Sequence, residues 1–89
     1  KVDFTKAKVE VTFGEYKEMD IAKAVGNAIH QNTSDIGVDE TARNIYHSEG
    51  ELEIPDEQIS AIIYALSNAS TILVSAKKAA LNLLKLTQE

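Results

Sequence analysis

The chain has 89 residues, a formal net charge of −5 and no cysteine, which corresponds to one small domain over residues 1–89. The missing cysteine excludes disulfides and thiolate metal ligands. The acidic balance disfavours direct nucleic-acid binding, because phosphate binders carry a basic face. No run of 18 apolar residues occurs and the N-terminus does not resemble a signal peptide, so we expect a cytoplasmic protein without a membrane span.

The N-terminal part predicts a β-hairpin of roughly residues 7–19. Gly14 marks its turn, and "YKEMDI" offers the returning strand, with Tyr16 near the core and Met19 as a second candidate. In "AKVEVTF" apolar and polar residues alternate strictly, as in a half-buried strand. We expect an aspartate at Val11 to unfold the domain, because the alternation places four residues on the inward face: Ala7, Val9, Val11 and Phe13.

Two short helices are predicted next. Asp20 is a candidate N-cap for "IAKAVGNAIHQ", in which apolar residues recur at helical spacing. Gly26 in its middle costs about 1 kcal/mol relative to alanine and allows another element to approach closely. Residues 34–37 are predicted as a loop. A second helix, "ETARNIYHS", begins at Val38 or Asp39, and its apolar face consists of Ala42, Ile45 and Tyr46.

The segment "ELEI", residues 51–54, alternates and predicts a third strand at the edge of the hairpin. Pro55 then stands where helices favour proline, and Asp56 and Glu57 complement the dipole of a first helical turn. These residues predict the start of the last helical segment.

From residue 59 to residue 84 apolar residues keep a spacing of three or four, without glycine or proline. One continuous helix over residues 57–87 would be roughly 46 Å long. The alternative is a break at "SNAST", residues 67–71, where Asn68 or Ser70 caps a new helix and two helices of about 11 and 16 residues fold back on each other. We expect the continuous or bent helix, because the segment has no turn glycine. The predicted fold is therefore α+β: an N-terminal hairpin or three-stranded sheet, two short helices and a long C-terminal helix.

A helix of this length requires a partner chain. The other 56 residues are too few to cover apolar stripes on more than one of its sides, and soluble monomers rarely expose such patches. We expect a homo-oligomer, in the first place a symmetric dimer. Its interface is predicted at Ile62, Leu66, Ala69, Leu73, Ala76, Ala80, Leu83 and Leu84.

No motif for catalysis, metal binding or cofactor binding occurs. His30 and His47 lie 17 residues apart on different predicted helices, which matches no metal-binding spacing, and we expect both on the surface. No serine stands in a Gly-x-Ser-x-Gly turn, and the four glycines are too scattered for a phosphate loop. We therefore predict no catalytic residues, no metal, no cofactor and no enzyme activity.

Residues 19–58, "MDIAKAVGNAIHQNTSDIGVDETARNIYHSEGELEIPDEQ", resemble small uncharacterised proteins encoded by bacteriophages and integrated mobile elements. The shared patterns are "D-[IL]-x-K-x-[LV]-G-N-x-I", "A-R-x-I-Y" and "[VL]-E-[IL]-x-[DE]-E-Q", and they cover under half of the chain. The resemblance implies a phage or mobile-element origin and action inside a bacterial cell, and no activity. The matching residues are Asp20, Ile21, Lys23, Val25, Gly26, Asn27, Ile29, Ala42, Arg43, Ile45, Tyr46, Leu52, Glu53, Ile54, Asp56, Glu57 and Gln58.

These observations predict a non-enzymatic protein-binding or structural module that self-associates through its C-terminal helix, for example a phage accessory or assembly protein. The alternative is an acidic phage-encoded inhibitor, of the anti-defence or DNA-mimic type, that binds a basic host protein. A mimic concentrates carboxylates on one face, whereas an assembly protein concentrates apolar residues at a symmetric interface.

Overall fold

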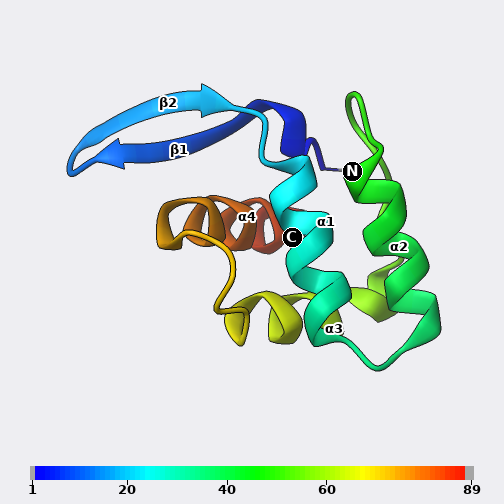
Figure 1. Cartoon of the computed structure of the whole chain (residues 1–89). Helices are drawn as coiled ribbons and strands as arrows, with labels where there is room; N and C mark the ends of the chain where they lie inside the picture. The colour runs from blue at the N-terminus through cyan, green and yellow to red at the C-terminus, as the bar shows by residue number, and fades with distance from the viewer. Residues whose placement is uncertain (1, 88–89) are drawn as a thin grey trace.

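The computed structural model describes the backbone of residues 2–87 and the side chains of residues 2–85. The described chain is α+β, as predicted, with a β-hairpin that extends as an arm from a group of helices (Figure 1). Its elements are η1 (Phe4–Lys6), β1 (Ala7–Thr12), β2 (Glu15–Met19), α1 (Ala22–Asn32), α2 (Ile36–Tyr46), α3 (Asp56–Ser67) and α4 (Val74–Thr87).

The hairpin over residues 7–19 is confirmed. β1 and β2 pair antiparallel, Gly14 takes a φ of +85° in the turn, and the register shifts at Val11 between Glu10 and Thr12. Ala7 and Val9 are buried against the helices, but the expectation that Val11 and Phe13 point inward is wrong: both are exposed. The hairpin reaches beyond the helices that cover its base (Figure 1). The alternation of apolar and polar residues therefore continues into a part of β1 that has no core beside it.

The returning strand contributes no buried residue to the core. All five residues of β2 are exposed, including Tyr16 and Met19, which were expected near the core. β1 alone packs against α4, which leaves β2 as an open edge strand.

A third strand at the hairpin edge does not form within the described residues. Leu52 instead exchanges two backbone hydrogen bonds with Val2, each 2.9 Å long, as an isolated antiparallel bridge. The cause is the 3-10 turn of η1, which separates Val2 from β1. Asp3 caps this turn through its side chain, which accepts a hydrogen bond from the backbone N–H of Thr5.

The two predicted short helices are present. The N-cap of α1 is Ile21 and not the predicted Asp20, although the Asp20 side chain accepts a hydrogen bond from the backbone N–H of Ala22. α2 begins two residues earlier than predicted, because the Asp35 carboxylate accepts hydrogen bonds from the backbone N–H groups of Gly37 and Val38. Of residues 34–37, which were predicted as a loop, Ile36 and Gly37 belong to the first turn of α2, and Asp35 is its N-cap.

The prediction of one long C-terminal helix is wrong. α3 starts after Pro55, as predicted, but ends at Ser67, and α4 starts at Val74, so the fold-back alternative describes the structure. The carbonyl groups at the end of α3 find partners without a glycine. The Asn68 side chain donates to the Tyr64 carbonyl, and the Lys77 ammonium donates to the Ala69 carbonyl at 2.6 Å.

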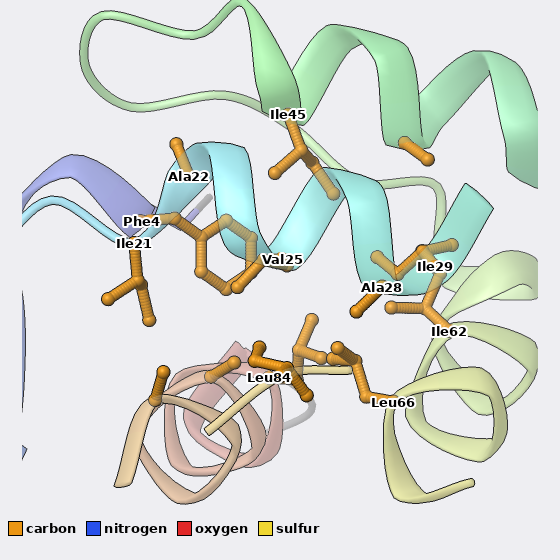
Figure 2. Packing of buried hydrophobic residues seen from close by; sticks show 14 of the residues in the cluster. Phe4, Ile21, Ala22, Val25, Ala28, Ile29, Ile45, Ile62, Leu66 and Leu84 are labelled. Carbon is orange, nitrogen blue, oxygen red and sulfur yellow. The ribbon is translucent and has the colours of Figure 1, made fainter. Parts of the chain in front are cut away.

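The core joins all the helices and the base of the hairpin. Helix α1 lies between α2 on one side and α3 with α4 on the other (Figure 2). The break between α3 and α4 lets both helices turn their apolar faces toward α1. The described part of one chain therefore buries most of the apolar surface that a partner chain was expected to cover. The largest fully buried side chains are Phe4, Val25, Ile29, Val38, Ile45, Ile62, Leu66 and Leu84.

Candidate functional site

Most of the predicted interface residues lie in the core of the single chain. Leu83 is half-buried and packs against the same core, and only Leu73, just before α4, is largely exposed. A second chain therefore has access to little of the predicted interface in this fold. The buried members are Ile62, Leu66, Ala69, Ala76, Ala80 and Leu84.

Several exposed apolar residues lie instead at the hairpin tip and at the start of α4. Phe13 at the tip is 99% exposed, and Val11, Leu73 and Val74 are also largely in solvent. A groove of about 440 Å³ opens between these elements, and we call it the hairpin–α4 groove. It is lined by Glu10, Val11, Thr12, Phe13, Val74, Ser75 and Lys78.

The lining of this groove combines apolar side chains with one acid and one base. Its floor is apolar, and its two charged residues, Glu10 and Lys78, are one acid and one base without a histidine or other group that exchanges protons near neutral pH. Glu10 accepts a hydrogen bond from the backbone N–H of Gly14 at 2.9 Å, which holds the turn beside the groove. Sequence reasoning missed this surface because alternation assigned Val11 and Phe13 to the interior.

A second hollow brings together the two histidines that the sequence placed on separate helices. This α1–α2 cleft has a volume of about 220 Å³ and lies along the contact between the two helices. Gly26 permits that contact, because a Cβ atom there would come within 2.8 Å of both the Ala42 carbonyl oxygen and the Tyr46 Cβ. The polar residues of the cleft are Asn27, His30, Asp39, Arg43, Tyr46 and His47.

Several of these side chains are held in place by neighbours. His30 Nδ1 is hydrogen-bonded to a carboxylate oxygen of Asp39, which joins the end of α1 to the first turns of α2. The rings of Tyr46 and His47 meet edge to face, with centroids 5.0 Å apart, and the Lys23 ammonium lies 5.3 Å from the Tyr46 centroid. In the described part of the chain no group of three metal-ligating side chains comes together, here or elsewhere.

One sequence feature could have found the cleft. Asn27 and His30 on α1, and Asp39, Arg43 and His47 on α2, recur at intervals of three or four residues, so each helix carries a polar stripe along one face. A short connection between helices favours antiparallel neighbours, which would have set the two stripes side by side.

Comparisons of the chain with models of known protein families, with curated proteins and with solved structures found no match. Among the described residues, no helix is both long and apolar enough to cross a membrane. The hairpin–α4 groove and the α1–α2 cleft are the two candidate functional sites of the described chain.

Proposed function

We propose that this protein is a non-enzymatic protein-binding module that forms a symmetric dimer through the hairpin–α4 groove. The observation that carries the proposal is Phe13, an aromatic side chain that is almost fully in water beside an apolar recess. Exposed aromatic side chains next to apolar hollows are typical anchors of protein interfaces.

A second copy is the partner that this surface fits best. A twofold interface needs a patch that is complementary to itself. The hairpin tip and the start of α4 together carry both halves of such a patch, a protruding ring at Phe13 and a recess lined by Val11 and Val74. In the dimer each Phe13 enters the groove of its partner, and Leu73 lies beside it. Glu10 and Lys78 at the groove are opposite charges, and across the twofold axis they form the polar rim.

The available area sets the expected strength. A phenylalanine buries roughly 150–250 Å², so the exchange of two Phe13 side chains removes roughly 300–500 Å² from water. Specific interfaces bury about 1,200–2,000 Å² in total. The remainder has to come from Val11, Leu73 and Val74 and from the hairpin backbone. The dimer is therefore expected near the lower size limit, in an equilibrium with monomer that shifts with concentration.

Light scattering or sedimentation at several concentrations tests the proposal with Phe13→Ser and, as a matched control, Ile36→Ser. Ile36 is also largely exposed, at 79%, but lies at the start of α2, away from the groove. Neither side chain supports the core, so both variants fold. We expect the parent and Ile36→Ser to dimerise and Phe13→Ser to remain monomeric. A parent that stays monomeric at high concentration, or equal effects of the two substitutions, overturns the proposal.

A second candidate function is inhibition of a basic host protein, which the resemblance of residues 19–58 to phage proteins motivates and one observation favours. Acids gather on the connection from α2 to α3 and its continuation into α3. Attraction between such a strip and a basic surface weakens as salt rises, whereas an apolar dimer persists in high salt. Repeating the scattering series in low and high salt with a basic partner protein separates the two. The exposed acids are Glu49, Glu51, Glu53, Asp56 and Glu57.

A further inference from the structure

We propose that the α1–α2 cleft binds the phosphate group of a small phosphate monoester. This site is independent of the proposed dimer, because it is built by α1 and α2, whereas the groove is built by the hairpin and α4. The cleft gathers cationic and hydrogen-bond-donating side chains on a chain whose net charge is −5.

Arg43 is the first reason to expect an anion. It lies four residues after Asp39, a spacing at which a carboxylate and a guanidinium on a helix ordinarily pair. Asp39 is instead hydrogen-bonded to His30, and Arg43 forms no ion pair with any residue in the range 2–85. The guanidinium therefore lines the cleft with its planar fork of donors uncommitted, and this fork matches the oxygen atoms of a phosphate.

The histidines supply donors on both sides of Arg43. Asp39 holds His30 through Nδ1, which orients the ring and leaves its Nε2 without a partner among the described residues. His47 lies at the other end of the cleft, with its ring held edge to face against Tyr46. The Asn27 amide adds a neutral donor from α1.

The floor of the cleft is a close contact between α1 and α2. Gly26 brings the two helices so close that their backbones nearly touch at Ala42 and Tyr46. The two rings are held by neighbours before a ligand arrives, His30 by Asp39 and His47 by Tyr46, and such preorganisation increases affinity.

Size and charge select the class of ligand. Sites for drug-sized molecules have volumes of about 300–1,000 Å³, and the cleft has about 220 Å³, so a phosphate group with a small substituent fits and a nucleotide does not. Two cations, Arg43 in the lining and Lys23 near the Tyr46 ring, outnumber the one carboxylate of the cleft, Asp39, so the site favours an anion. A phosphate group offers more oxygen atoms than a carboxylate to the donors of Arg43 and Asn27.

Titration of the ¹⁵N-labelled full chain with glycerol phosphate, followed by NMR at constant ionic strength, tests the proposal. Inorganic phosphate is the second arm, which shows whether the monoester substituent contributes, and acetate and chloride are the comparison anions. We expect saturable shift changes confined to α1 and α2 around Asn27, His30, Arg43 and His47, with both phosphates and not with acetate.

Two substitutions sharpen the test. Arg43→Ala is expected to weaken phosphate binding about tenfold or more, because it removes charge-assisted hydrogen bonds. Lys8→Ala removes an exposed cation from β1, outside the cleft, and should leave binding unchanged. Both residues are exposed, so both variants keep the fold. Shift changes spread over all the basic residues, equal effects of acetate and phosphate, or an unchanged affinity in Arg43→Ala overturn the proposal.

Discussion

Burial along β1 changes within two positions, and this is where single residues decide how the arm behaves. Val9 is 3% exposed and Val11 is 45% exposed, although both belong to the same alternating pattern. At Val11 the register of the hairpin shifts, and the helices no longer cover the strand. The base of β1 therefore contributes to stability, whereas its tip is available for contacts with a partner.

Aspartate substitutions at these two valines should have different effects. Burial of a valine side chain is worth about 1.5–3 kcal/mol, and a buried carboxylate without a partner costs more. We expect Val9→Asp to unfold the domain and Val11→Asp to fold and lose dimerisation, which corrects the expectation that Val11→Asp unfolds it. Urea unfolding followed by circular dichroism measures the difference. Similar midpoints for the two variants would contradict the order of burial.

Asp3 makes a small part of the stability depend on pH. A side-chain hydrogen bond from Thr5, assisted by the Thr5 backbone N–H, holds the pKa of this carboxyl below its ordinary value. A depressed pKa in the folded state means that the contribution is complete above the unfolded pKa, about 3.9, and is lost as the pH falls through the lower folded value. We expect Asp3→Asn to be less stable than the parent at pH 7 and to show a smaller loss below pH of about 4. Thermal unfolding from acid to neutral pH checks this, and parallel curves for the two proteins would refute it.

At the scale of elements, the contact between α1 and α2 depends on one missing side chain. Gly26 costs helix stability within α1, but it lets the Ala42 and Tyr46 backbones of α2 approach, and this approach forms the floor of the cleft. The sequence-based expectation that a glycine here permits a close neighbour is confirmed.

Gly26→Ala is therefore expected to destabilise the protein in spite of the better helix former. The gain in propensity is about 1 kcal/mol, whereas forcing a methyl group into a packed contact costs about 1–3 kcal/mol. Gly50→Ala is the control, because a Cβ at Gly50 meets no atom within 4 Å. Denaturant titration should show a net loss for Gly26→Ala only, accompanied by shift changes at His30 and Arg43. If the Gly26→Ala variant were more stable than the parent, α1 and α2 would be able to move apart without a loss of packing free energy.

At the scale of the whole molecule, the break between α3 and α4 closes the core within one chain. The connecting segment packs inward through Ala69 and Ile72 and reaches α1 through a 2.7 Å hydrogen bond from Thr71 to the Gln31 side chain. The interface predicted along the C-terminal helix is thereby occupied by α1 and β1. The surface left for a partner is the much smaller groove at the hairpin tip.

Amide hydrogen exchange tests the break directly. The backbone N–H groups of residues 70–73 donate no hydrogen bond within the described chain, whereas those of Leu66 and Ala80 lie inside helices. We expect residues 70–73 to exchange much faster than residues 62–66 and 78–82, because exposed or unbonded amides open with little free-energy cost. Uniform protection from residue 59 to residue 84 would instead indicate one continuous helix. The predicted interface residues along that helix would then be accessible to a partner chain.

The sequence by itself determined the elements whose signals are local. Strict alternation and Gly14 predict the hairpin, helical spacing predicts α1 and α2, and Pro55 with two acids predicts the start of α3. In each case the information lies in backbone preferences and in neighbours a few residues away, which do not depend on the rest of the fold.

The tertiary structure decided where the apolar surfaces go. The alternation of residues predicts to which side of the hairpin Val11 and Phe13 point. Only the extent of the helices decides whether core residues lie on that side. No residue in 67–71 forces a break, and the chain folds back because two helices against α1 bury more apolar surface than one helix in water. His30 and His47 share a cleft because α1 and α2 pack side by side. The spacing along each helix indicates a polar stripe, but the close contact of the two helices is decided by the tertiary structure.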